Sequence, residues 1–104
     1  MDIQKLAAFT SLAETLSYSK TAEERFTTQG NITKQIQALE RELGLRLFNR
    51  SSRKISLTTA GKNLLLGAQT IVAQWELLQE QALELQRENR HRLVIQTIPT
   101  INKY

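Results

Sequence analysis

The sequence predicts a mainly α-helical fold, in which three short helices and a β-hairpin are followed by one long helix. Three observations carry this prediction. Apolar residues recur at three- and four-residue steps in several segments, and polar or glycine-containing breaks separate these segments. Ile55 and Leu57 instead alternate with polar residues, as in a half-buried strand. Residues 59–89 then contain no proline and keep a helical repeat throughout.

The first two helices are predicted from Ile3 to Leu16 and from Ser17 to Phe26. Asp2 is a suitable N-cap for the first helix and Ser19 for the second, because their side-chain oxygens can accept a hydrogen bond from a free backbone N–H. The apolar positions expected to face inward are Leu6, Phe9, Ala13 and Leu16 in the first helix, and Ala22 and Phe26 in the second.

A polar break containing Gly30 separates the second helix from a third, which begins at Gln29 or Gly30 and is ended by Gly44. One face of the third helix is apolar and comprises Ile32, Ile36, Leu39 and Leu43. The other face is polar and comprises Asn31, Thr33, Lys34, Gln37 and Arg41. Two helices joined by a tight turn, the second with a polar outer face, form the plan of a helix-turn-helix.

A short β-hairpin is predicted next, with strands at residues 45–48 and 54–57 around a polar tip. Arg50 and Arg53 flank two serines in this tip, and Lys54 follows them. Such a basic wing can lie along or in the minor groove of DNA, where narrow A·T stretches attract arginine. Residues 1–58 therefore predict a winged helix-turn-helix domain.

The long helix is predicted over residues 59–89, with Thr58 or Thr59 as its cap. Its apolar residues follow steps of four and three, which is the a/d seam of a coiled coil. The seam comprises Leu64, Ala68, Ile71, Trp75, Leu78, Ala82 and Leu85. Thirty residues span roughly 45 Å, which is too long for so small a head to cover. We therefore expect the seam to form a homodimer interface.

Residues 90–104 are expected to begin a further domain, with a strand from Leu93 to Gln96. Pro99 and the last residues have no predicted partner in the chain. We therefore expect the sequence to be a piece of a longer protein, or a truncated one.

Composition and charge narrow the function. The net charge is +4, yet residues 29–62 alone carry seven basic and two acidic side chains, so the positive charge is concentrated there. Such a patch favours a polyanionic partner. No cysteine is present, which excludes disulfides and thiolate metal sites. No apolar run approaches the roughly 20 residues that span a bilayer, and we expect a cytoplasmic protein.

No catalytic site is expected. The only histidine, His91, stands between two arginines after the long helix and is expected to be a solvated linker residue. Four glutamates share one face of the long helix with no histidine among them, so we expect no metal site: Glu76, Glu80, Glu84 and Glu88. No nucleotide-binding fingerprint is present, and no cofactor is expected.

Several short motifs follow one another along the chain. They are L-S-Y-S-K-T-A-E at residues 16–23, T-Q-G-N-I-T-K-Q-I at 28–36, A-L-E at 38–40, L-G at 43–44, L-F-N-R at 47–50 and L-T-T-A-G at 57–61. Their order and spacing over about residues 2–98 resemble the N-terminal region of LysR-type transcriptional regulators. Arg25, Thr27 and Gly30 depart from the family, which usually has leucine, valine and proline there.

The resemblance implies sequence-specific binding of double-stranded DNA by a dimer that regulates transcription. The residues it places at or near DNA are Thr28, Gln29, Asn31, Thr33, Lys34 and Gln37, and the wing adds Arg50, Arg53 and Lys54. Gln29 and Asn31 have amides that can pair with adenine, whereas Lys34 suits a phosphate. The implied dimer packs residues 59–89 antiparallel.

The resemblance also implies an effector-binding domain after the long helix. A small-molecule effector would act only through that domain, of which this chain would hold the first strand. The full-length protein would then be able to form higher oligomers. Two alternatives stay open on the residues alone: a protein–protein adaptor whose long helix binds a partner, and a winged-helix protein of the MarR type with its dimer interface elsewhere.

Overall fold

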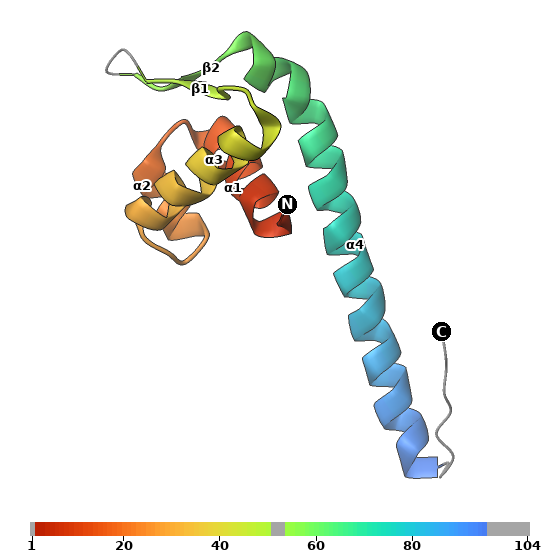
Figure 1. Ribbon diagram of the computed structural model, residues 1–104. Helices are drawn as coiled ribbons and strands as arrows, with labels where there is room; N and C mark the ends of the chain where they lie inside the picture. The colour runs from red at the N-terminus through yellow and green to blue at the C-terminus, as the bar shows by residue number, and fades with distance from the viewer. Residues whose placement is uncertain (1, 51–53, 96–104) are drawn as a thin grey trace. The chain divides into compact units, whose positions relative to one another are not determined.

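The computed structural model describes residues 2–50 and 54–95, with side chains as far as Arg90. Its elements are α1 (Ile3–Thr15), α2 (Tyr18–Glu24), α3 (Gln29–Leu43), β1 (Phe48–Asn49), β2 (Ser56–Leu57) and α4 (Thr59–Ile95) (Figure 1). The chain divides into two compact units, Met1–Ala73 and Gln74–Tyr104, here called the head unit and the tail unit. The predicted mainly helical fold with a hairpin and a long last helix is confirmed.

Three short helices begin at side-chain caps in extended backbone. The Asp2 side chain accepts a hydrogen bond from the Gln4 N–H (2.9 Å), and the Thr28 hydroxyl accepts one from the Asn31 N–H (3.0 Å). The cap of α2 is Ser17 and not Ser19 as predicted, because Ser17 has extended dihedrals and its hydroxyl accepts from the Lys20 N–H. The helix therefore starts at Tyr18, and the other serine lies inside its first turn.

The turn between α2 and α3 differs from the prediction at Phe26. We expected its side chain on the inner face of α2, but the helix ends at Glu24 and Phe26 is 95 % exposed. Its φ of 56° lies in the left-handed region, which reverses the chain so that the Thr27 N–H donates to the Ala22 carbonyl (2.9 Å). The prediction failed because Phe26 keeps the helical spacing from Ala22, although the helix has already ended before it.

The core of the head unit lies between α1, α2 and α3 and extends to β1. Its largest fully buried side chains are Phe9, Leu12, Ile32, Ile36, Leu39, Leu47 and Phe48. The rings of Phe9 and Phe48 meet edge to face, with centroids 5.8 Å apart and an interplanar angle of 81°, an arrangement that adds to the area they bury. Phe48 thereby joins the hairpin to α1.

The first turns of α4 also belong to this core. Ala68 is buried in it, and the partly buried Leu65 and Val72 pack against the same core. This corrects the prediction that Ala68 belongs to a dimer interface: its side chain is already covered by its own chain. An a/d repeat predicts which residues share a helix face. It does not predict whether each of these residues is buried by its own chain or by a partner.

The hairpin is shorter than predicted. Phe48 pairs with Leu57 and Asn49 with Ser56 in antiparallel register. Leu45 stays outside the ladder, since its N–H donates to the Glu40 carbonyl at the end of α3 (3.1 Å). The expected tip at residues 51–53 lies outside the described residues.

Thr58 connects the hairpin to α4. Its N–H donates to the Leu47 carbonyl (3.0 Å) and its hydroxyl donates to the Arg46 carbonyl (2.6 Å). The same hydroxyl accepts from the Gly61 N–H (2.9 Å) and so caps the helix. A Cβ on Gly61 would collide with the Leu47 carbonyl oxygen, so the glycine is what lets the helix start this close to the strand.

The end of α4 also differs from the prediction. We expected the helix to end near Asn89 and a strand to begin at Leu93, but α4 continues to Ile95. Residues 89–95 contain no proline or glycine that would end the helix. A helix also pairs its own backbone N–H and C=O groups, whereas a strand would need a second strand as its partner. A domain that starts at residue 90 remains a prediction.

Candidate nucleic-acid interface

The outer face of α3 carries the residues that the sequence singled out for DNA. Thr28, Gln29, Asn31, Lys34 and Gln37 are exposed, and Thr33 is half-buried. On the inner face Ile32, Ile36 and Leu39 are fully buried. The helix is therefore fixed to the head unit by one face and presents polar groups on the other, as a helix that enters a major groove must.

Local hydrogen bonds already involve part of this polar set. The Asn31 amide donates to the Thr27 hydroxyl (3.0 Å), and the Thr33 hydroxyl donates to the Gln29 carbonyl (3.1 Å). Thr33 therefore offers its methyl group more readily than its hydroxyl. Within the described part of the chain, the side chains of Gln29, Lys34 and Gln37 have no hydrogen-bond partner. Their donors and acceptors are available to a ligand.

Arg50 has a different position from the one predicted for a wing residue. Its side chain is 26 % exposed, its Nε donates to the Tyr18 hydroxyl (3.2 Å), and its Nη1 lies 3.4 Å from Oε1 of Glu40. Burial alone lowers the pKa of the Arg50 guanidinium, but Tyr18 and Glu40 raise it, and the net pKa lies above its ordinary value. Arg50 thus braces β1 against α2 and α3, because it stands at the end of β1 and not at the loop tip.

Glu40 is the partner that sequence reasoning missed. Its side chain is only 7 % exposed, and one carboxylate oxygen accepts from the N–H groups of Leu47 (2.8 Å) and Phe48 (3.4 Å). The signal was its spacing: Glu40 stands four residues after Ile36 and next to Leu39, at the edge of the apolar stripe. An acid there must find partners in the fold, since unpaired buried charge is costly.

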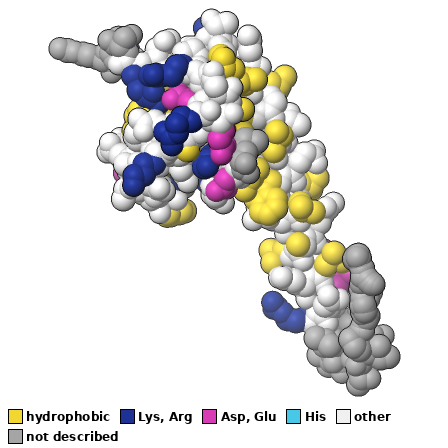
Figure 2. All heavy atoms as spheres, in the orientation of Figure 1, with side chains coloured by type: hydrophobic (Ala, Val, Ile, Leu, Met, Phe, Trp, Pro, Cys, Tyr) yellow, Lys and Arg dark blue, Asp and Glu magenta, His cyan; other side chains and the backbone are white. Residues whose placement is uncertain are grey.

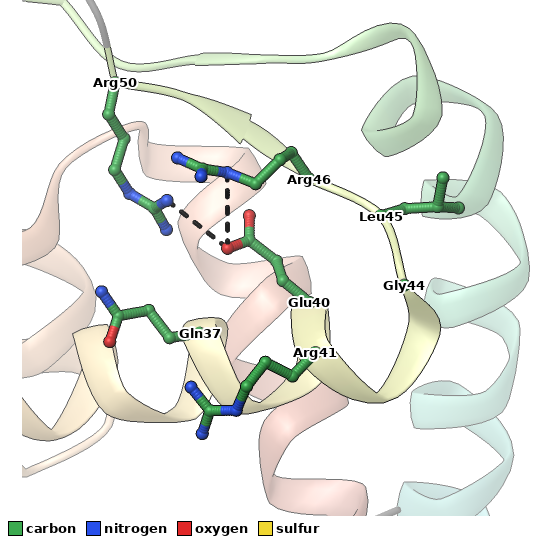
Figure 3. Close-up of a pocket in the computed structure, with 7 residues that line it drawn as sticks. All are labelled: Gln37, Glu40, Arg41, Gly44, Leu45, Arg46 and Arg50. Carbon is green, nitrogen blue, oxygen red and sulfur yellow. Dashed lines mark hydrogen bonds and ion pairs between the residues drawn. The ribbon is translucent and has the colours of Figure 1, made fainter.

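A cleft of about 560 Å³ lies between the C-terminal half of α3 and the start of the hairpin (Figure 3). It is lined by Gln37, Glu40, Arg41, Gly44, Leu45, Arg46 and Arg50. Gln37 and Arg41 extend from α3, whereas Arg46 and Arg50 approach Glu40 from the hairpin side. Lys and Arg side chains gather on this part of the head unit, with few acidic atoms among them (Figure 2).

Of the two other predicted wing residues, Lys54 lies within the described residues and Arg53 does not. Lys54 is exposed where the chain enters the second half of the hairpin. Arg53 lies outside the described residues, so its contact with DNA remains a prediction.

The predicted seam of α4 remains largely open to solvent apart from Ala68. Leu64, Ile71, Trp75, Leu78, Ala82 and Leu85 are all exposed within the single chain. The Trp75 side chain keeps 39 % of its surface accessible. Large apolar side chains repeated along one helix face are unfavourable in water unless a partner covers them.

Among the described residues no group of three or more His, Cys, Asp or Glu side chains is arranged to hold a metal ion. Over the same residues, no helix has both the length and the apolar character needed to cross a membrane.

Residues 3–62 match the family model described as bacterial regulatory helix-turn-helix protein, lysR family. The chain is 34 % identical over 89 residues to the HTH-type transcriptional regulator HdfR of Salmonella newport (strain SL254). That match covers 86 % of this chain and 32 % of HdfR, so the chain spans about a third of this curated relative. HdfR of Salmonella typhimurium matches to the same extent, and the name of both proteins describes a transcriptional regulator.

The chain is also similar to solved structures of DNA-bound proteins. DarR of Vibrio fischeri in complex with DNA is 33 % identical with a TM-score of 0.75, over 84 % of this chain and 30 % of DarR. The BenM DNA-binding domain in complex with its benA site 1 DNA is 27 % identical with a TM-score of 0.73, over 82 % of this chain and 96 % of that domain. The head fold and the following helix therefore recur in proteins crystallised on DNA.

Proposed function

Because the chain belongs to the LysR family of bacterial helix-turn-helix regulatory proteins, we propose that it binds double-stranded DNA sequence-specifically as the DNA-binding part of a transcription regulator. The family match decides against the MarR-type alternative. The observation that carries the proposal is the outer face of α3, where Gln29, Lys34 and Gln37 are exposed with no partner in the described residues.

Recognition of DNA would involve no making or breaking of covalent bonds. Amide side chains such as Gln29 can form paired hydrogen bonds with an adenine edge, and a threonine methyl can contact the methyl of thymine. Lysine contacts with phosphates set the register but carry no sequence information. The N–H groups at the start of α3 add to the attraction for phosphate.

The functional unit would be a homodimer formed through α4. Ile71, Trp75 and Leu78 expose apolar surface on one face of the helix, and the same helix of a second chain, packed antiparallel, is the surface that would match it. Two heads would then bind two half-sites of an inverted repeat, separated by a whole number of helical turns of about 10 bp. Higher oligomers and response to a small-molecule effector would depend on parts of the longer protein, and the dimer would act on DNA in the cytoplasm.

Selection of bound sites from a random duplex library tests this proposal. We expect an enriched inverted repeat, and we expect its affinity to fall steeply with salt because phosphate contacts release counterions. A library that yields no motif, together with weak and salt-insensitive binding, would favour a protein–protein adaptor instead.

A further inference from the structure

We propose that the cleft between α3 and the hairpin is a seat for one phosphate of the DNA backbone, and that Arg41 and Arg46 are the groups that contact it. This inference rests on the proposed function, because it concerns how the same head holds a duplex. It assigns a ligand contact to two side chains that the sequence did not predict to bind DNA.

The charge of the cleft favours an anion. Its lining holds the guanidinium groups of Arg41, Arg46 and Arg50 and one carboxylate, that of Glu40. This carboxylate is buried and accepts hydrogen bonds from two backbone N–H groups and from Arg50, and it offsets only one of the three positive charges. The cleft therefore keeps an excess of two positive charges on its open side.

Two of the three guanidinium groups are available. The Arg46 side chain is 67 % exposed, and its Nε is 4.0 Å from Oε1 of Glu40, so this ion pair is weak. Arg41 is exposed and has no acidic partner among the described residues. Arg50 is held by Tyr18 and Glu40, and its Nη2 is buried with no hydrogen-bond partner among the residues that the structure describes. Exposed guanidinium groups that lack a strong acidic partner are the groups that a phosphate oxygen would bind.

The cleft also continues the face that reads bases. Lys34, Gln37 and Arg41 follow steps of three and four and are neighbours on the surface of α3. A second cleft is lined by these three side chains together with Lys5, Gln35 and Ala38. When the N-terminal half of a recognition helix lies in the major groove, basic groups further along it meet the backbone that borders the groove. The seat therefore lies where a phosphate, and not a base edge, is the expected contact.

The double variant Arg41→Gln/Arg46→Gln tests the seat in the whole chain. Both side chains are exposed, and Arg50 is left in place because it braces the hairpin. Affinity is measured for the selected duplex and for an unrelated duplex over a salt series. We expect the slope of log K against log salt to become shallower by about 0.9, the value for one phosphate contact. Both duplexes should weaken by the same factor, with base preference unchanged. Arg87→Gln/Arg90→Gln on α4 is the control, since it also removes two positive charges from exposed arginines but lies outside the cleft.

Duplexes with one backbone phosphate replaced by an uncharged methylphosphonate locate the contact. At the seated position this replacement should weaken the wild type several-fold but have no further effect on the double variant. Equal weakening of both proteins at every position, or a wild-type slope that the double variant keeps, overturns the seat while DNA binding stands. Competition by inorganic phosphate at matched ionic strength, without any methylphosphonate effect, would assign the cleft to a free anion and overturn the backbone contact. A wild type that binds no duplex overturns the proposed function itself.

Discussion

The carboxylate of Glu40 and the guanidinium of Arg50 form a partly buried ion pair, with Oε1 and Nη1 3.4 Å apart. Glu40 belongs to α3 and Arg50 follows β1, so the pair fixes the recognition helix to the hairpin. The same carboxylate accepts from the N–H groups of Leu47 and Phe48. One side chain thus accepts from two backbone donors and pairs with one partly buried cation.

Glu40→Ala should therefore destabilise the head unit strongly. It leaves Arg50 without its counter-charge and two backbone N–H groups without an acceptor, at a cost of about 3 kcal/mol. Glu40→Gln keeps an acceptor oxygen and should cost clearly less. Urea unfolding at one fixed protein concentration measures both, because a dimer's stability depends on concentration. Equal stability of Glu40→Ala and wild type would show that the carboxylate does not brace the hairpin.

Two glycines of α4 should respond oppositely to alanine. At Gly61 a Cβ would collide with the Leu47 carbonyl oxygen, whereas at Gly67 nothing lies within 4 Å of the new atom. Gly61→Ala should cost about 1–3 kcal/mol through overpacking. Gly67→Ala should gain about 0.5–1 kcal/mol, because glycine disfavours a helix interior. Thermal unfolding compares the two, and a stabilising Gly61→Ala would mean that the helix can start further from the strand.

Phe26→Asn should stabilise the fold even though it removes an aromatic ring. The ring is almost wholly exposed, while the left-handed backbone is unfavourable for phenylalanine and tolerated by asparagine. The expected gain is about 0.5–1 kcal/mol. Phe26→Val serves as a contrast and should lose stability, since a β-branched residue suits this conformation least. A loss with asparagine would reveal a contact of the ring that stabilises the fold.

Gln29→Ala should relax base preference. We expect a loss of about 1–3 kcal/mol on the preferred operator and little loss on variants at the one position that Gln29 reads. Thr33→Ser gives a second test, because it keeps the hydroxyl that donates to the Gln29 carbonyl and removes the methyl. Binding is measured across all single-base variants of the selected site. Uniform weakening on every variant and on random DNA would show that these residues do not read bases.

Trp75→Asp should yield monomers and abolish tight operator binding while the head unit stays folded. The change places a charge in an apolar interface, where it has no partner. Leu77→Asp is the matched control, since Leu77 is a similarly exposed apolar residue two positions away and off the seam. Sedimentation at micromolar concentration decides the matter. If Trp75→Asp stayed dimeric, the interface would lie elsewhere.

Periodicity and capping chemistry predicted most of the head unit. Leu16 and Leu43 are exceptions, because both were predicted to face inward but are 43 % and 40 % exposed at the ends of their helices. The start of α3 at Gln29, its end at Gly44 and the rest of its buried stripe follow from the sequence, because each depends on local geometry. The same holds for the exposed polar face, which is the opposite side of a helix whose inner side is apolar. The cap of α2 was predicted wrongly at Ser19, since Ser17 has the same capping chemistry two residues earlier.

What the sequence did not reveal depends on contacts between distant residues. Ala68 fits the seam by spacing, but only the three-dimensional fold shows that the head covers it. Arg50 looks like a free wing charge until Glu40 and Tyr18 are placed beside it. Glu40 itself was counted as surface charge, because a single sequence does not show which acids are buried.

The residues of α3 that hold it in the fold are different from those on its outer face. Ile36, Leu39 and Glu40 hold it in the fold. The side chains of Gln29, Lys34 and Gln37 face away and form no hydrogen bond or ion pair within the described chain. Exposed positions of this kind can usually be exchanged at little cost in stability. Evolution or protein engineering could therefore change the DNA sequence that is recognised by a few substitutions at exposed positions of α3, while the buried face keeps the fold intact.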